Sequence, residues 1–168
     1  MIQRFRVPLG FVVAAAVLYL ATPTRLSLAV GFPVAVIGAL CRALAAGIIR
    51  KDARLATSGI YTWTRNPLYF GSFLLSVGFA IMSWSVLAAA LLIVPSAVVY
   101  PNVIRNEESH LRHLFGAEFE AYCRSVPRFL PRIGRLEQGF SLAQYTANRE
   151  YNAAIGLIAG TLVLAWKL

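Results

Sequence analysis

Residues 67–103 read PLYFGSFLLSVGFAIMSWSVLAAALLIVPSAVVYPNV and contain two apolar runs, Leu68–Met82 and Val86–Val103. Only the tripeptide Ser83–Ser85 separates them. This pattern predicts a helical hairpin with Trp84 at a membrane interface, where Trp is enriched. A helix needs about 20 apolar residues to cross the hydrocarbon core. The first run is shorter, so it must recruit flanking residues, thin the bilayer or cross incompletely.

Three further apolar segments flank the hairpin, namely Phe5–Ala21, Leu26–Ile49 and Tyr151–Leu168. The chain has 168 residues, and 58% of them are hydrophobic. A soluble domain of this length cannot bury so much apolar surface. The sequence therefore predicts an all-α, polytopic membrane bundle of about five transmembrane helices. We expect one domain over residues 1–168, in which the last segment is an additional, short transmembrane helix.

The positive charge of the chain follows its predicted topology. The formal net charge is +9. In a soluble protein this excess suggests nucleic acid, but Arg and Lys beside membrane helices orient them in the bilayer, so no nucleic-acid partner is expected. Basic residues cluster before the first segment, between the second and third, and between the fourth and fifth. Five crossings with a cytoplasmic N-terminus place all three clusters in the cytoplasm of a multi-pass protein, in the inner or cell membrane if bacterial.

The first segment has an alternative interpretation as a cleaved signal peptide, because Arg4 and Arg6 precede a short apolar run. No clear small-x-small cleavage site follows Leu20, and Pro23 lies close by. We therefore expect a transmembrane helix here.

An amphipathic pattern covers residues 106–122, where apolar and charged side chains alternate at helical spacing. It predicts a cytoplasmic amphipathic helix that is interrupted near Gly116 and lies against the bundle or the membrane surface. Pro127 and Pro131 are expected to end it.

Two polar blocks interrupt the apolar chain. Residues 57–71 read TSGIYTWTRNPLYFG, and residues 107–122 read EESHLRHLFGAEFEAY, followed by a Pro-flanked arginine at 128. Together they resemble the paired signature of the isoprenylcysteine carboxyl methyltransferase and phospholipid methyltransferase superfamily. Its first block reads T-S-G-x-Y-x-x-x-R-[HN]-P-x-Y-x-G, and its second reads E-E-x-x-L-x-x-x-F-G-x-x-[YF]-x-x-Y. The match extends over about Leu55 to Pro131 in the right order, with no gap inside either block.

The resemblance implies an S-adenosylmethionine site at the cytoplasmic face. The residues it assigns to the cofactor are Leu55, Ala56, Gly59, Tyr61, Arg65, Asn66, Pro67, Tyr69 and Glu107. Physical chemistry agrees in part, because Pro67 suits the first turn of a helix whose N-terminus favours a carboxylate. Gly59 supplies a permissive turn. The residue types alone also fit a topogenic loop with interfacial aromatics and basic flanks.

The catalytic candidates are Arg105 and Glu108. Arg105 is expected at the cytoplasmic mouth near Glu107, as the cation that holds an anionic acceptor head. Glu107 and Glu108 are expected to end the fourth helix, where adjacent carboxylates oppose the helix dipole and need a reason. The alternative for Glu108 is a solvated ion pair with Arg112, four residues later. Which of the two carboxylates contacts the cofactor stays open.

Two departures from the family pattern concern the acceptor. Asn66 stands where many relatives carry His and cannot titrate. Val103 stands where relatives often place an Arg that contacts substrate, and Arg105 follows two residues later. We expect a lipophilic acceptor with a carboxylate, thiol or amine head, entering from membrane lipid, and little activity on a prenylated cysteine. The missing histidine favours a head that is already anionic.

Two rival functions stay open from the sequence. They are an NADPH-dependent membrane reductase of the sterol type and a non-catalytic membrane scaffold.

Two groups of polar side chains lie outside the family signature or have no role in it. His110 and His113 have ligand spacing, but no other Cys or His clusters with them, so no metal is expected. Arg42 lies inside the second apolar run, where it either snorkels to the interface or lines the cofactor cavity.

Overall fold

The computed structural model describes residues 6–50, 52–134 and 139–168. Within these ranges the regular elements are helices and no strand forms, which confirms the all-α prediction. The elements are α1 (Arg6–Leu20), α2 (Arg25–Ala46), the 3-10 turn η2 (Gly59–Thr62), α3 (Pro67–Ser83), α4 (Val86–Ser125), α5 (Leu142–Ala147) and α6 (Tyr151–Trp166). Arg4 and Phe5, which belong to the predicted first segment and its basic flank, lie outside the described residues.

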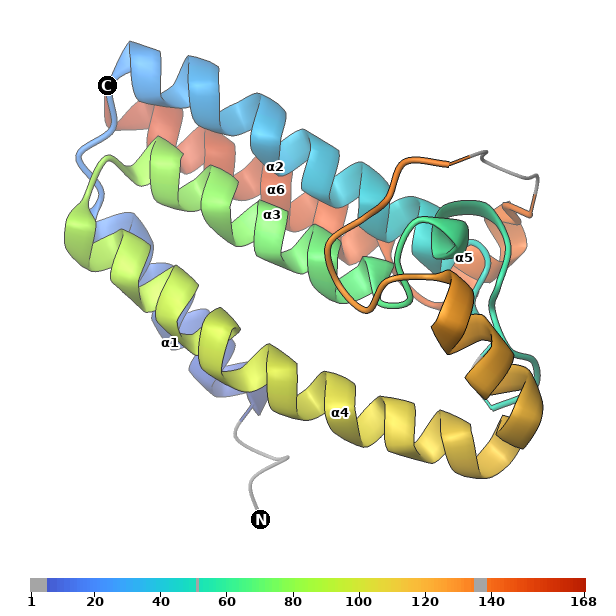
Figure 1. The fold of residues 1–168 in the computed structure, drawn as a ribbon. Coiled ribbons are helices and arrows are strands. Elements are labelled where there is room, and N and C mark those ends of the chain that lie inside the picture. Colours follow the sequence, from blue (N-terminus) through green and yellow to red (C-terminus); the bar gives the residue numbers. More distant parts are fainter. Residues whose placement is uncertain (1–5, 51, 135–138) are drawn as a thin grey trace.

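The long helices form two layers (Figure 1). One layer holds α2, α3 and α6, and the other holds α1 and α4. α3 and α4 form the predicted hairpin, which turns at Trp84 in a left-handed conformation with φ 48°. From this turn the two helices diverge toward the opposite end of the bundle, where α2 ends and α3 and α6 begin (Figure 1). Both polar blocks of the sequence meet at that opposite end.

α2 and α3 approach each other so closely that glycine is required at the contact. A Cβ on Gly38 would lie 2.6 Å from the carbonyl oxygen of Gly71, and one on Gly31 would lie 2.6 Å from that of Gly78. The two glycines of each helix are about two turns apart, so they share one face. Small residues at a membrane helix interface permit such backbone contact. Gly71, the last residue of the first polar block, therefore serves helix packing.

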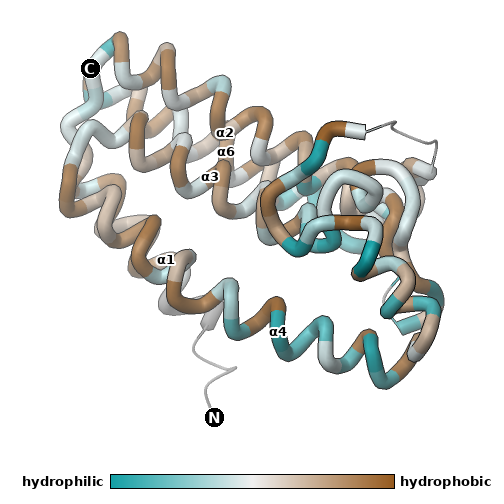
Figure 2. Tube along the Cα trace, in the orientation of Figure 1, coloured by the Kyte–Doolittle hydropathy of each residue, from teal (hydrophilic) through white to brown (hydrophobic). Residues whose placement is uncertain are grey.

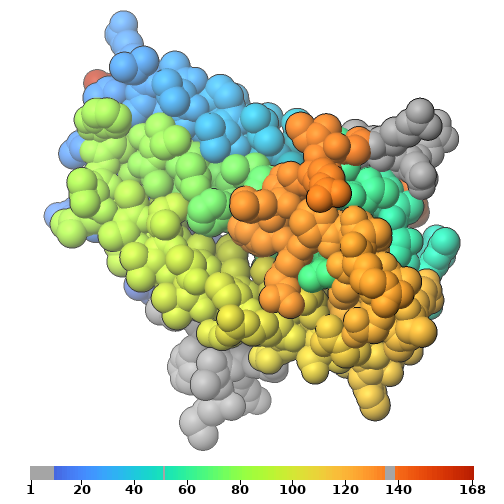
Figure 3. Space-filling model, in the orientation of Figure 1, coloured from blue at the N-terminus to red at the C-terminus, as the bar shows by residue number. Residues whose placement is uncertain are grey.

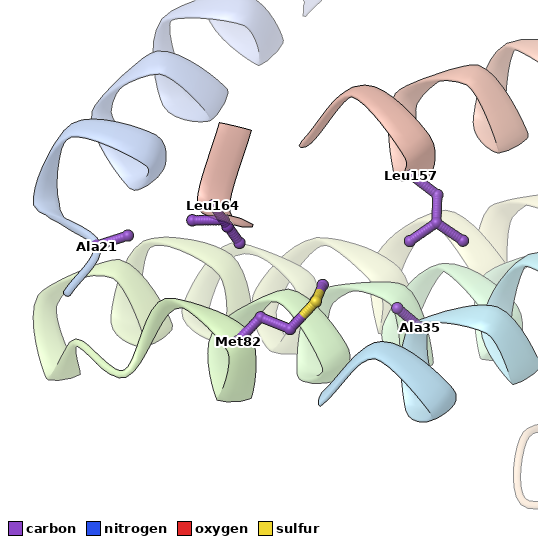
Figure 4. Close-up of a cluster of buried hydrophobic side chains, with 5 residues drawn as sticks. All are labelled: Ala21, Ala35, Met82, Leu157 and Leu164. Carbon is purple, nitrogen blue, oxygen red and sulfur yellow. The ribbon is translucent and has the colours of Figure 1, made fainter. Parts of the chain in front are cut away.

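An apolar cluster fills the bundle near the Trp84 turn (Figure 4). Met82 of α3 and Leu164 of α6 are fully buried there, beside Ala35 of α2. The hydroxyl of Ser27 donates to the carbonyl oxygen of Met82 at 3.1 Å and closes the cluster. Lys167 donates from Nζ to two of the last carbonyls of α1 and, at 2.6 Å, to that of Ala21 just after the helix. It thereby satisfies acceptors that a helix end leaves without partners.

The hydropathy of the bundle has the distribution of a membrane protein. Hydrophobic residues line its long axis, and hydrophilic ones gather around the second half of α4 and the neighbouring loops (Figure 2). Of the described helices, α2 and α4 are long and apolar enough to cross a membrane. α3 and α6 have 17 and 16 residues, which confirms that the third and fifth segments are short. At 1.5 Å per residue they measure about 25 Å.

The fourth helix is longer than the sequence predicts. The run Val86–Val103 and the separate amphipathic helix form the single helix α4, because no proline or glycine follows Pro101 until Gly116. Gly116 breaks the helix with φ 47° and ψ −118°, which confirms the predicted interruption. Glu107 and Glu108 lie inside the helix, so the expectation that they end it was wrong. α2 ends at Ala46, earlier than predicted, and α5 was not predicted.

Candidate active site

A cavity of about 290 Å³ lies at the end of the bundle away from Trp84. Its walls come from the loop after α2, the η2 turn, the start of α3 and the second half of α4. The predicted site residues that line it are Leu55, Ala56, Tyr61, Arg65, Asn66, Pro67, Tyr69, Glu107 and Glu108. Gly59 and Arg105 do not line it. The fold thus gathers residues from both polar blocks around one space.

Two backbone features shape the wall that the first block contributes. Gly59 has φ +58°, the turn conformation expected of it. Pro67 occupies the first turn of α3 directly after Asn66, also as expected. Gly59 therefore shapes the backbone and does not contact the cavity: it starts the 3-10 turn that places Tyr61 in the cavity wall.

Glu108 is the centre of a buried charge cluster. Its side chain is 3% exposed. One carboxylate oxygen accepts from Nε and Nη2 of Arg65, each at 3.0 Å, and the other accepts from Nε and Nη2 of Arg128, each at 2.9 Å. The amide of Asn66 donates to the first oxygen at 3.4 Å. Charge-assisted hydrogen bonds of this kind fix both oxygens of the carboxylate, so Glu108 is suited to holding the site together.

The alternative pairing of Glu108 with Arg112 is wrong. Arg112 donates to Glu120 on the exposed side of the same helix segment. The segment from Arg112 to Glu120 crosses the break at Gly116, so residues eight apart in sequence meet there. Glu108 is buried and is reached by two arginines from other segments, so it does not pair with Arg112.

Glu107 lines the cavity beside this cluster and is half-buried. Its carboxylate accepts a hydrogen bond of 2.8 Å from the hydroxyl of Tyr69. The Tyr69 ring in turn packs against Tyr100, with 5.6 Å between ring centroids. Glu107 keeps one oxygen that accepts no hydrogen bond from another described residue, so it has acceptor capacity left for a ligand in the cavity.

Tyr61 presents a buried donor to the cavity. Its side chain is 5% exposed, and its hydroxyl has no hydrogen-bond partner among the described residues. Its carbonyl oxygen is held by the hydroxyl of Tyr122 at 2.7 Å. Burial raises the pKa of the Tyr61 hydroxyl well above its ordinary value, and Tyr122 and Glu107 raise it further. The hydroxyl therefore stays protonated. Leaving it without a hydrogen bond costs about 1–3 kcal/mol, which a ligand that accepts this hydrogen bond would recover.

The strap, Val126–Gly134, closes the site along the first block. Arg65 donates from its backbone N to Pro127 O at 2.9 Å, and Arg132 donates in the same way to Trp63 O at 2.9 Å. The indole of Trp63 donates to Gly134 O at 2.8 Å. Figure 3 shows the strap as an orange segment over the start of α3 and beside α4. These bonds fix Arg128 opposite Glu108.

Arg128 is a site residue that sequence reasoning missed. The signal available was the Pro-flanked arginine at the end of the second block, which had no assigned role. Arg128 follows Glu108 by 20 residues and reaches it only because α4 turns at Gly116 and the strap returns. That path cannot be deduced from helical periodicity.

Arg105 lies on a different face of α4 from Glu107. It is exposed and lines a groove formed by Phe73, Ser96, Ala97, Tyr100, Pro101, Ile104, Arg128 and Phe129. Two residues along a helix are separated by about 200° of rotation, so Arg105 and Glu107 cannot point into one cavity. The expectation that Arg105 lies at the cavity mouth beside Glu107 was wrong.

Arg42 joins three helices. It pairs with Glu150 at the start of α6 through Nε at 2.6 Å and Nη2 at 3.0 Å, and it donates to the hydroxyl of Ser72 on α3. It does not line the cavity, so neither snorkelling nor cavity lining describes it. His110 lies 3.0 Å from Asp52 at the cavity wall, and the described residues contain no group of three or more potential metal ligands.

Part of this chain is similar to known proteins. Residues 45–118 match the family model for phospholipid methyltransferase. This segment is similar to that family. It contains every residue assigned above to the cofactor or to catalysis, whereas Tyr122 and Arg128 lie beyond it. The resemblance stated from the two polar blocks is thereby confirmed.

Named relatives match about half of this chain. The nickel-cobalt-cadmium resistance protein NccN of Alcaligenes xylosoxydans xylosoxydans is 42% identical over 50% of the chain and 39% of its own length. The cobalt-zinc-cadmium resistance protein CzcN of Cupriavidus metallidurans is 40% identical over 50% and 38%. The protein-S-isoprenylcysteine O-methyltransferase of Rattus norvegicus is 33% identical over 51% and 30%. The match thus covers less than two-fifths of each relative. No solved structure matches the chain.

Proposed function

We propose that this chain is an integral membrane methyltransferase, which binds S-adenosylmethionine in the cavity and methylates a lipophilic acceptor at the cytoplasmic side. Similarity to a methyltransferase family supports the reaction type. Relatives named protein-S-isoprenylcysteine O-methyltransferase support it further. The observation that carries the proposal is the cavity itself, which collects residues of both polar blocks and presents the unpaired Tyr61 hydroxyl.

The cavity offers complementary groups for the parts of S-adenosylmethionine. Glu107 has acceptor capacity for an ammonium or a ribose hydroxyl. Tyr61 offers a donor for a carboxylate, a ribose oxygen or an adenine nitrogen. The N-terminus of α3 also favours a carboxylate. Aromatic faces of Tyr61 and Tyr69 suit an adenine or a cationic sulfonium.

When bound, the cofactor supplies a methyl group activated by its sulfonium. The protein's own residues are left to orient the acceptor and to exclude water. Glu108 is committed to two arginines, and Asn66 cannot titrate, so neither is suited to removing a proton. This favours an acceptor whose nucleophile is already anionic, and Arg105 remains a candidate cation for its head. The expected catalytic role of Glu108 becomes one of positioning Arg65 and Arg128.

Calorimetric titration of the purified protein with S-adenosylmethionine and with NADPH tests the proposal. We expect saturable binding of S-adenosylmethionine and none of NADPH. Binding of NADPH alone would point to a membrane reductase, and binding of neither would point to a scaffold. Protein that binds S-adenosylmethionine is then incubated with methyl-labelled cofactor and lipid extracts, and labelled lipid identifies the acceptor.

A further inference from the structure

The groove beside Arg105 is apolar along its length and basic at one end. Phe73 of α3 and Ala97 and Ile104 of α4 supply apolar lining, and Phe129 of the strap packs edge-on against Phe73 with 6.0 Å between ring centroids. Arg105 and Arg128 are the charged residues among those that line it, and no carboxylate does. The groove therefore pairs an apolar surface with two guanidinium groups.

Arg128 is shared between this groove and the charge cluster of the cavity. Its side chain is 53% exposed, whereas that of Arg65 is 9% exposed. Nε and Nη2 of Arg128 face Glu108, and Nη1 forms no hydrogen bond with any residue that the structure describes. Since Arg65 already neutralises Glu108, Arg128 brings a positive charge to the groove that this carboxylate does not cancel.

The groove lies directly against the cavity. Tyr100 lines the groove, Tyr69 lines the cavity, and their rings are in contact. The Arg128 guanidinium spans the same boundary, because it lines the groove and binds a carboxylate of the cavity wall. A head group at Arg128 would therefore stand next to the cofactor cavity.

We propose that this groove binds the apolar part of the acceptor and that Arg128, assisted by Arg105, selects an anionic head group. The inference rests on the proposed function and supplies the substrate cation that Val103 does not. Arginine suits this role, because its planar fork donates to two carboxylates in fixed directions. One edge holds Glu108, and Nη1 remains for the acceptor. Arg128 is thus a specificity-determining residue that connects the acceptor to the cluster behind the cofactor.

Two chemically matched probes test the selection without knowledge of the natural acceptor. Dodecanoate and dodecanamide share one chain and differ in head charge. Each is measured by equilibrium dialysis at pH 9, against protein in phosphatidylcholine nanodiscs and against empty nanodiscs. We expect the protein-dependent affinity for dodecanoate to exceed that for dodecanamide about tenfold, as one charge-assisted contact provides. Equal affinity for both probes would overturn the proposal.

Arginine variants locate the selection. Arg128→Gln is expected to remove most of the preference for dodecanoate, and Arg128→Lys to keep part of it. Arg105→Gln should reduce it, and because this exposed side chain has no described ion pair, the fold is not at risk. Arg124→Gln is the matched control, since Arg124 is exposed, carries the same charge and lies outside the groove. If Arg128→Gln and Arg105→Gln both behave like Arg124→Gln, the assignment of the head group to these two arginines is refuted.

Titration of the same samples with S-adenosylmethionine separates this inference from the proposed function. Cofactor binding without head-group preference would sink the inference alone. A preference that Arg128→Gln abolishes, in protein that does not bind S-adenosylmethionine, would sink the proposed function and leave an anion-selective amphiphile site.

Discussion

The interface between α2 and α3 and the cluster around Glu108 both hold α3 in place, but by opposite means. At the first, four glycines bring two backbones into contact, and the charged side chain of Arg42 lies beside Gly71. At the second, a carboxylate ties the start of α3 to α4 and the strap through two arginines. Helices in lipid gain little from burying apolar surface against each other, so shape must supply the attraction. Charges are retained at the end of the bundle, where the polar site is built.

The largest expected effect comes from removing the charge that organises the site. Glu108→Ala leaves Arg65 buried without its carboxylate, and breaking a buried pair in this way costs on the order of 3 kcal/mol. Thermal unfolding in detergent should show a clear loss of stability. Glu120→Ala, which breaks an exposed pair, is the control and should leave the unfolding temperature unchanged. Equal behaviour of the two variants would remove the distinction between a structural centre and a surface pair.

A smaller loss is expected at the glycine interface. Gly38→Ala places a methyl group 2.6 Å from a backbone oxygen of α3, and overpacking of this kind costs about 1–3 kcal/mol. Gly156→Ala on α6 is the matched control, because a Cβ there meets nothing within 4 Å. It should be neutral or slightly stabilising, since Ala has the higher helix propensity. A stable Gly38→Ala variant would show that the two helices are not in backbone contact.

Two tyrosine variants at the cavity should affect cofactor affinity and protein stability separately. Tyr61→Phe removes a buried hydroxyl that has no described protein partner, so the stability of the ligand-free protein should be kept or raised while S-adenosylmethionine binding weakens about fivefold. Tyr122→Phe removes a hydroxyl that supports the Tyr61 carbonyl, and it should lower stability by about 1 kcal/mol. Titration calorimetry and thermal unfolding on both variants check the contrast. Unchanged cofactor affinity in Tyr61→Phe would argue against a ligand at this hydroxyl.

The smallest perturbation tests which end of the bundle faces the cytoplasm. Ser58→Cys and Ser125→Cys lie at the cavity end, and Ser85→Cys lies at the hairpin turn. In a background without the native cysteines, an impermeant thiol reagent should label the first two from the cytoplasm and the third from outside. Labelling of Ser58→Cys and Ser125→Cys from opposite sides would refute the proposed orientation.

The sequence predicted the parts of this molecule that depend on local rules. Apolar run length located the helices, Ser83–Ser85 located the hairpin turn, and Gly116 located the break in α4. The spacing within the two polar blocks placed nearly all cofactor candidates in one cavity. Their binding and catalytic roles remain predictions, as does the single domain over residues 1–168.

The unpredicted parts depend on contacts between distant segments. The pair of Glu108 with Arg128 requires the return of the strap, and the pair of Arg42 with Glu150 joins residues 108 apart in the chain. The rotation of about 100° per residue along α4 turns Arg105 toward the groove and away from Glu107. The change from apolar to polar residues predicts an end of the helix near residues 103–106, but polar residues do not break a helix and α4 continues through them.

The break at Gly116 fixes the length of the chain around the cavity. One helix supplies Glu107 before the break and Tyr122 after it, and both line the same space. Each residue inserted on either side would turn the following helix by about 100° and carry Tyr122 away from the carbonyl of Tyr61. Between these positions we expect exchanges of outward-facing side chains to be tolerated, and an insertion or deletion to displace Tyr122 from the cavity.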